Sequence, residues 1–191
     1  ILRAQHGQGG HLTLTKLAGY QLAQALETSG RVQLSADFQE LAHDLAHPET
    51  LPLPDIAVAA DLRDYQKEGV KWLSMLDKYG FGGILADDMG LGKTLQTIAF
   101  LSSRLTKESS VLILAPASLI YNWQEEFHRF VPEIDMAVVY GHKAEREVLL
   151  EQQHQVLVTS YASFRQDIEL YRKTKQYDYL ILDEAQVMKN S

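Results

Sequence analysis

The chain of 191 residues contains no cysteine, which excludes disulfide bonds and every zinc site built on cysteine thiolates. Proline is scarce, with five residues, and no apolar run approaches the roughly 20 residues that cross a bilayer. Positive charge is in deficit, because 18 lysines and arginines face 25 aspartates and glutamates and the net charge is −7. The composition therefore argues against strong nucleic-acid binding through overall charge, while a local basic strip stays compatible with it.

What the chain does contain fits a globular enzyme domain. Hydrophobic residues make up 46% of it, and nine tyrosines, six phenylalanines and two tryptophans are enough for a sizeable core. The absence of cysteine is compatible with a reducing compartment, and no secretory signal is present. Because the sequence starts at Ile1 rather than at a methionine, we expect it to be a piece of a longer protein.

The most informative segment is a glycine-rich loop between a predicted strand at residues 82–86 and a predicted helix at residues 95–105. Gly90 and Gly92 have no Cβ, so their backbone can turn successive N–H groups toward one anion. The positive end of the helix dipole adds to this attraction. The segment therefore predicts a phosphate-binding loop.

Two side chains beside this loop suit a nucleoside triphosphate. Lys93 can reach the β- and γ-phosphates, and the hydroxyl of Thr94 can ligate Mg²⁺. Asp87 occupies the first glycine position of the usual pattern G-x-x-x-x-G-K-[ST], which weakens the match. Taken alone, the loop could also be an ordinary glycine-rich turn.

An acidic pair follows a second short apolar segment. Residues 179–182 predict a buried parallel strand, and Asp183 and Glu184 come directly after it. Ligands collect at the carboxyl ends of such strands. Asp183 is placed to hold Mg²⁺, and Glu184 to orient and deprotonate an attacking water. The alternative is an acid pair that caps a turn, but its position downstream of a phosphate-binding loop favours the catalytic interpretation.

Strands and helices alternate from residue 61 onward, which predicts an α/β fold with a mostly parallel sheet and helices on both faces. Ser118 is expected to cap a helix that carries Trp123 on its apolar stripe. Further helices are expected at residues 62–76 and 95–105, and strands at residues 82–86, 111–115, 137–140, 156–159 and 179–182.

The first 60 residues have a different character. Helical spacing at residues 14–27 and 38–47 predicts two helices, and three of the five prolines within residues 48–54 favour an extended connector. We therefore expect a helical appendage and linker at residues 1–60 and a separate domain at residues 61–191.

Two polar clusters allow both a functional and a structural interpretation. His43 and His47 stand four residues apart around Asp44 and could hold zinc, but with no third ligand in view a solvated helix face is favoured. A basic loop before the last strand could touch a phosphate backbone, but such a loop is more often simply solvated; its residues are Arg172, Lys173 and Lys175.

The motifs of residues 61–191 form a series of five blocks. They are residues 62–66 with Gly69, Trp72 and Leu73; residues 84–94; residues 115–119 with Asn122, Trp123, Glu126 and Phe127; residues 158–161; and residues 183–186 with Lys189 and Asn190. Together they resemble the Swi/Snf-type ATPases of helicase superfamily two. That family places an acid at the Asp87 position, and Asp88 stands where it most often has glutamate. The Asp-Glu-Ala-Gln form of the last block is similar to the bacterial branch.

The resemblance implies a P-loop domain that is the first of two RecA-like lobes, with ATP and Mg²⁺ as cofactors. Tyr65 and Gln66 would lie near the adenine, and Asp183 with Thr94 would hold Mg²⁺. Glu184 would act on water, and Gln186 would couple the nucleotide state to the partner lobe. The phosphates would be held by Asp88, Met89, Gly90, Leu91, Gly92, Lys93 and Thr94.

The resemblance also implies that the partner is duplex DNA, and that the protein moves along the duplex without unwinding it. The nucleic-acid face would include Pro116, Ser118, Asn122, Thr159 and Ser160, whose polar groups suit phosphate contacts that carry no sequence information. The protein would be cytoplasmic and associated with the nucleoid in a bacterium, or nuclear in a eukaryote, and no membrane partner is implied.

Two parts of the family's motor are expected to be absent from this chain. One is a strand that lies between the phosphate-loop strand and the acidic strand, so we expect those two strands to lack their shared neighbour. The other is the second lobe with its arginine finger, which is worth about 10³- to 10⁵-fold in rate. We therefore expect the piece alone to hydrolyse ATP negligibly and to bind duplex DNA weakly, while the intact protein is a DNA-stimulated ATPase.

Two other functions stay open at this point. A strand-separating DNA or RNA helicase would share this lobe, and so would a nucleotide-sensing module that is not an enzyme. The sequence beyond Ser191 would separate the three possibilities, because it carries or lacks the motifs of the second lobe.

Overall fold

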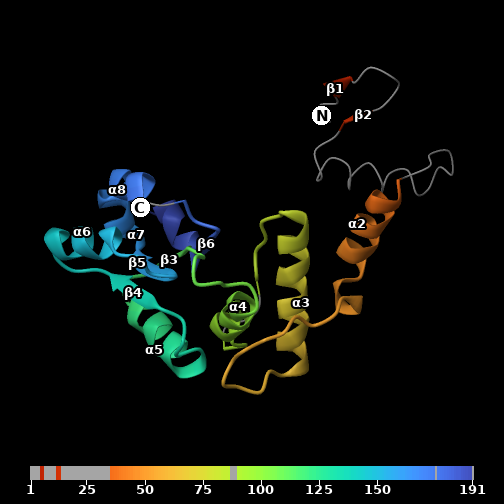
Figure 1. The fold of residues 1–191 in the computed structure, drawn as a ribbon, viewed down its shortest axis with the longest axis horizontal. Helices are drawn as coiled ribbons and strands as arrows, with labels where there is room; N and C mark the ends of the chain where they lie inside the picture. The colour runs from red at the N-terminus through yellow and green to blue at the C-terminus, as the bar shows by residue number, and fades with distance from the viewer. Residues whose placement is uncertain (1–4, 7–11, 14–34, 87–89, 175, 191) are drawn as a thin grey trace. The chain divides into compact units, whose positions relative to one another are not determined.

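The computed structural model describes residues 5–6, 12–13, 35–86, 90–174 and 176–190 (Figure 1). They form two compact units. One consists of Lys71–Ile84 with the described residues up to Pro52, and the other of Leu53–Val70 with the described residues from Leu85 onward. The helix predicted at residues 14–27 lies outside the described residues. No helix in the described part of the chain is long and apolar enough to cross a membrane.

The second unit contains a four-stranded parallel sheet with the strand order β4-β5-β3-β6. The strands are β3 (Val111–Ala115), β4 (Met136–Val139), β5 (Val156–Ser160) and β6 (Tyr179–Leu182). In the register, Leu112 of β3 lies opposite Leu157 of β5 and Leu180 of β6. All residues of β3 and β5 are buried, as expected for central strands of a sheet covered on both faces. The α/β prediction and these four strands are confirmed.

Helices cover both faces of this sheet (Figure 1). One face packs on the group α6 to α8 through a core that includes Leu112, Leu157, Leu150 and Tyr171. The other face packs on α5, which also contacts α4. The helices are α4 (Lys93–Ser102), α5 (Ile120–Phe130), α6 (Lys143–Glu151), α7 (Tyr161–Gln166) and α8 (Ile168–Thr174), and a 3-10 helix, η2 (Ala185–Asn190), follows β6.

The strand predicted at residues 82–86 is wrong. These residues have no regular secondary structure, and the side chain of Ile84 is 85% exposed. β6 forms one edge of the described sheet, and its side chains Leu180 and Leu182 are 58% and 41% exposed. A strand forms only where its backbone N–H and C=O groups meet those of a neighbour. Among the described residues no strand pairs with residues 82–86.

Two smaller predictions also differ from the structure. Ser118 does not cap α5, because Leu119 occupies the N-cap position and makes no side-chain capping hydrogen bond. The predicted basic loop is partly helical, since Arg172 and Lys173 lie in the last turn of α8, while Lys175 lies outside the described residues. Arg172 donates to Glu169 one turn earlier at 3.2 Å, which is an exposed contact within the helix.

The first unit is built on helices. It contains α2 (Ala36–Ala46), the short 3-10 helix η1 (Pro48–Thr50) and the last turns of α3 (Asp64–Tyr79), and α3 contributes its first turns to the second unit. A small antiparallel pair, β1 (Gln5–His6) and β2 (Leu12–Thr13), is also described. The expected helix at residues 38–47 thus corresponds to α2, and the one at residues 62–76 to α3.

A buried carboxylate joins α2 to α3. Asp44 of α2 accepts hydrogen bonds from Lys78 Nζ at 2.9 Å and from Tyr79 Oη at 2.7 Å. Burial raises the pKa of Asp44, but these hydrogen bonds and the charge of Lys78 together lower it by more. The net result is a pKa below the ordinary value of 3.8. The solvated helix face expected around His43 and His47 is therefore wrong at Asp44, which is 6% exposed. Within the described residues no group of three or more metal-ligating side chains forms a metal site.

Candidate nucleotide site

The loop before α4 has the backbone expected of an anion cradle. Gly90 and Gly92 have φ angles of 87° and 71°, in the left-handed region that favours glycine. Gly92 is the N-cap of α4 and has no side chain that could cap the first N–H groups of this helix. Lys93 and Thr94 begin the helix and are half-buried. Asp88 and Met89, also predicted to bind phosphate, lie outside the described residues.

Two glutamine side chains hold this loop through hydrogen bonds to its backbone. Nε2 of Gln66 and Nε2 of Gln96 donate to the carbonyl oxygen of Leu91 at 3.4 and 3.3 Å. Oε1 of Gln66 also accepts from the Arg63 N–H at 3.0 Å. A Cβ on Gly69 would lie 1.8 Å from Oε1 of the fully buried Gln96, so glycine is required there for the close approach. The loop is therefore positioned by α3 and α4 together.

Gln96 was not predicted as a site residue from the sequence. Its position just before the apolar run of residues 98–101 in α4 could have been noticed, because an amide that is buried with such a run needs hydrogen-bond partners. Gln66, which was predicted to lie beside the adenine, also contacts the loop through its hydrogen bond to the Leu91 carbonyl oxygen. Tyr65, predicted in the same role, is half-buried on the first turn of α3.

Asp183 is held by contacts from three elements. Its Oδ2 accepts from Nε1 of Trp123 on α5 at 2.9 Å. Its N–H donates to the carbonyl oxygen of Leu114 on β3, and its own carbonyl oxygen accepts from the hydroxyl of Tyr161 on α7, both at 2.8 Å. Burial, together with the negative charges of Asp183 and Glu184, raises the pKa of Tyr161, so its hydroxyl stays a donor. The carboxylate is thus fixed at the carboxyl end of β6.

The chain turns sharply after Asp183. Glu184 has a φ of 50°, and it is the only non-glycine residue with positive φ among the described residues. Such a conformation is unfavourable for a side chain with a Cβ and is concentrated at functional sites. Nε2 of Gln186 donates to the Glu184 carboxylate. The two residues predicted to act on water and to sense the nucleotide are therefore in contact.

The residues predicted on the nucleic-acid face divide into two groups. Thr159 and Ser160 are buried at the end of β5. The hydroxyl of Thr159 donates to the carbonyl oxygen of Val139 at 2.7 Å, and Oγ of Ser160 accepts the N–H of Ser163 at 3.1 Å as the N-cap of α7. Their hydroxyls therefore make internal hydrogen bonds in this structure.

The other group lies around the start of α5. Ser118 and Asn122 are exposed, and Pro116 is half-buried at the end of β3. Asn122 directly precedes Trp123, so neighbouring residues on one helix present one side chain to solvent and one to Asp183. Because α5 packs on α4, the same helix also adjoins the element that begins with Lys93.

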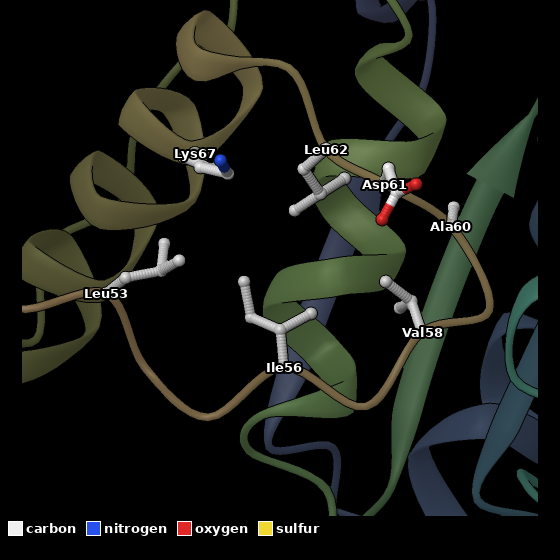
Figure 2. Close-up of a pocket in the computed structure, with 7 residues that line it drawn as sticks. All are labelled: Leu53, Ile56, Val58, Ala60, Asp61, Leu62 and Lys67. Carbon is white, nitrogen blue, oxygen red and sulfur yellow. The ribbon is translucent and has the colours of Figure 1, made fainter.

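A separate pocket of about 440 Å³ lies beside the first turns of α3. Figure 2 shows the side chains of Leu53, Ile56 and Leu62 turned toward one space that the connector encloses. It contains none of the predicted phosphate, metal or nucleic-acid residues. The full lining is Leu53, Ile56, Val58, Ala60, Asp61, Leu62 and Lys67.

Comparison with known proteins gives consistent results. A family model described as SNF2-related domain matches residues 65–191. An "Uncharacterized ATP-dependent helicase" of Mycoplasma pneumoniae is 45% identical over 133 residues, which are 68% of this chain and 13% of that protein. The TATA-binding protein-associated factor MOT1 of Saccharomyces cerevisiae is 41% identical over 171 residues, 81% of this chain and 9% of that protein. The human chromatin-remodeling ATPase INO80 is 37% identical over 169 residues, 78% of this chain and 11% of that protein.

A solved structure is similar as well. The Sulfolobus solfataricus SWI2/SNF2 ATPase core in complex with dsDNA aligns with a TM-score of 0.62 at 35% identity, over 73% of this chain and 30% of that one. The chain thus spans about a tenth of the length of these relatives and less than a third of the aligned ATPase core.

Proposed function

Because this chain belongs to the SNF2-related domain family, we propose that it is the ATP-binding lobe of a DNA-dependent ATPase that moves along duplex DNA. The observation that carries this proposal is the pair of left-handed glycines in front of α4, in the same unit as an aspartate fixed at the end of β6. The first feature suits a triphosphate, and the second suits the metal that accompanies it.

The donor groups at the loop fit a nucleoside triphosphate. Backbone N–H groups at Gly90 and Gly92, the start of α4 and the ammonium of Lys93 all favour an anion. The hydroxyl of Thr94 and the carboxylate of Asp183 are oxygen ligands of the kind that Mg²⁺ takes. When bound, Mg²⁺ would neutralise charge on the phosphate oxygens.

The remaining residues of the site have separate roles in this proposal. Glu184 orients the attacking water and accepts its proton. Gln186 holds the Glu184 carboxylate through a hydrogen bond until the partner lobe takes over this contact. Tyr65 and Gln66 lie beside the adenine. Asp88, Met89 and Leu91 contribute to the loop around the phosphates.

We propose that duplex DNA lies along the face formed by the start of α5. The exposed Ser118 and Asn122 supply hydroxyl and amide groups for sequence-independent contacts to phosphates, beside Pro116. Thr159 and Ser160 shape this face through the internal hydrogen bonds of their hydroxyls. Support comes from the similar Sulfolobus solfataricus ATPase core, which was solved with dsDNA.

The rest of the intact protein enters the proposal in three places. Residues 1–60 are a helical appendage and linker before the lobe at residues 61–191. A second RecA-like lobe supplies the arginine finger, and a strand from outside this chain pairs with the open edge of β6. The protein acts where DNA is, at the nucleoid of a bacterium or in the nucleus of a eukaryote.

A strand-separating helicase is the second candidate, and the name of the Mycoplasma pneumoniae relative, an ATP-dependent helicase, favours it. The deciding experiment is an ATPase and unwinding assay of the full-length protein with duplex DNA, single-stranded DNA and RNA. We expect duplex DNA to stimulate hydrolysis most, with no strand separation. Stimulation by single strands together with unwinding would support the helicase instead.

The same protein tests the roles of two residues. Lys93→Ala should weaken nucleotide binding, whereas Glu184→Gln should preserve binding and abolish hydrolysis, because phosphate binding and water activation are separable. Titration of a fluorescent ATP analogue measures the first effect and steady-state hydrolysis the second. Glu125→Gln is the matched control, because it makes the same change on the exposed side of α5. Equal loss of affinity in the Lys93 and Glu184 variants would contradict the assignment.

A further inference from the structure

Two buried aromatic side chains donate hydrogen bonds to the same residue of the acidic site. Nε1 of Trp123 lies 2.9 Å from Oδ2 of Asp183, and the hydroxyl of Tyr161 lies 2.8 Å from the carbonyl oxygen of Asp183. Trp123 is 4% exposed and Tyr161 9% exposed, so neither donor exchanges freely with water. We propose that Trp123 and Tyr161 are positioning residues for the metal and water chemistry of this site.

Trp123 acts on the carboxylate of Asp183. A buried indole N–H needs an acceptor, and here the acceptor is one oxygen of the predicted metal ligand. This contact fixes the rotation of the carboxylate and so directs its other oxygen. Partners of this kind orient a ligand before the metal binds, and their loss typically costs about 10- to 100-fold in metal affinity or activity.

The surroundings of Trp123 make it a rigid support. Its ring packs against Phe127 one turn later, at 6.2 Å between ring centroids. Phe127 is fully buried between α5 and the sheet. The indole is therefore held by packing on one side and by Asp183 on the other, and a rigid donor fixes its acceptor better than a mobile one does.

Tyr161 acts on the main chain instead. Its hydroxyl binds the carbonyl group of Asp183, which forms the peptide bond to Glu184. The N–H of Asp183 is meanwhile held by Leu114 of β3. These two hydrogen bonds fix the backbone immediately before Glu184 enters its left-handed conformation at φ 50°. Tyr161 thus fixes the backbone from which the Glu184 side chain projects. Trp123 fixes the orientation of the Asp183 carboxylate.

The two roles predict different defects. Removing the Trp123 donor frees the metal ligand, so metal affinity falls. Removing the Tyr161 hydroxyl relaxes the turn at Glu184, so the rate of hydrolysis falls while metal affinity stays close to that of the unaltered protein. This inference rests on the proposed function, because it assumes that Asp183 meets Mg²⁺ and that Glu184 meets water.

The test uses the full-length protein with ADP and Mn²⁺, whose free concentration is followed by electron paramagnetic resonance. We expect Trp123→Phe to weaken Mn²⁺ binding about tenfold. Trp72→Phe is the matched control, because it makes the same substitution on α3, and it should leave Mn²⁺ affinity unchanged. Tyr161→Phe should lower kcat about tenfold at saturating Mg²⁺ and ATP. Unchanged Mn²⁺ affinity in Trp123→Phe, or unchanged kcat in Tyr161→Phe, would overturn the corresponding role.

A measurement on the unaltered protein covers the case in which Trp123→Phe does not fold. With ¹⁵N-labelled tryptophan, one indole N–H resonance should broaden when Mn²⁺ and ADP bind, because Trp123 lies next to the metal ligand. If no indole resonance broadens although Mn²⁺ is bound, the inference about Trp123 is wrong. If the unaltered protein binds no Mn²⁺ with ADP at all, the proposed nucleotide site itself is wrong.

Discussion

Replacing Gly92 by alanine should damage the predicted phosphate-binding loop, and the structure allows the size of the effect to be estimated. Gly92 has a φ of 71°, which costs an L-residue about 1–2 kcal/mol. An alanine Cβ would also lie 2.6 Å from Nε2 of Gln66, which is too close, so that side chain has to move. Gln66 then loses its hydrogen bonds to Leu91 and Arg63, each worth about 0.5–1.5 kcal/mol.

The minimum total is about 2 kcal/mol, which corresponds to roughly a 30-fold change in an equilibrium constant. Whether this cost lowers the ATP affinity or the stability depends on whether the loop can relax when no nucleotide is bound. If it can, the variant folds normally and binds ATP at least about 30-fold more weakly. If it cannot, the free energy of unfolding falls by the same amount. Titration of a fluorescent ATP analogue and thermal unfolding of the same sample measure both quantities.

Gly90→Ala is the matched control for this prediction. Gly90 also has a left-handed φ, at 87°, but a Cβ there would meet nothing within 4 Å. Only the backbone cost of about 1–2 kcal/mol applies, so its loss of affinity should be about 5- to 30-fold and smaller than the loss in Gly92→Ala. Equal losses in the two variants would show that the contact with Gln66 does not matter. No loss of either affinity or stability in Gly92→Ala would refute the reasoning altogether.

Two further predictions concern stability. Arg146 and Asp167 form a buried ion pair, with Nε to Oδ2 at 2.5 Å, so Arg146→Met should lower the free energy of unfolding in urea by about 3–5 kcal/mol, and adding Asp167→Asn should restore part of it. If the single and double variants are equally destabilised, a stranded charge is not the cause. Hydrogen bonds from Tyr79 and Lys78 lower the pKa of Asp44 despite its burial, so this carboxylate stabilises the fold above its unfolded pKa of 3.8, and that contribution is lost as pH falls through the lower folded pKa. Urea unfolding between about pH 6 and pH 3 should therefore show a weaker pH dependence in Asp44→Asn than in the unaltered protein; an identical dependence would assign the acid sensitivity to other groups.

The elements that could be predicted from the sequence are those specified by local patterns. β3, β5 and β6 are short apolar runs, and their bounds agree with the prediction to within one residue. The glycines before α4 indicate their left-handed conformation because few other residues adopt it. The positions of Asp183 and Glu184 follow in the same way from a strand that ends in two acids.

The features that were missed depend on residues far apart in the chain. Residues 82–86 have the composition of a strand, but a strand also needs a neighbour, and composition does not reveal whether one is present. Asp44 has the spacing of a solvated position, yet it is buried and accepts hydrogen bonds from Lys78 and Tyr79. The pattern of apolar residues on α5 does not predict that Trp123 supports Asp183. The indole ring packs against apolar neighbours, while its N–H donates a hydrogen bond to Asp183.

The open edge of β6 also bears on how such a protein is made. Its backbone edge and the exposed Leu180 and Leu182 form a strand surface that can pair with any other extended segment. A polypeptide is synthesised at about 5–20 residues per second, and during that time an edge strand without a neighbour is available to wrong partners. The strand that precedes Asp183 is thus also a surface that favours aggregation when no partner strand covers its edge.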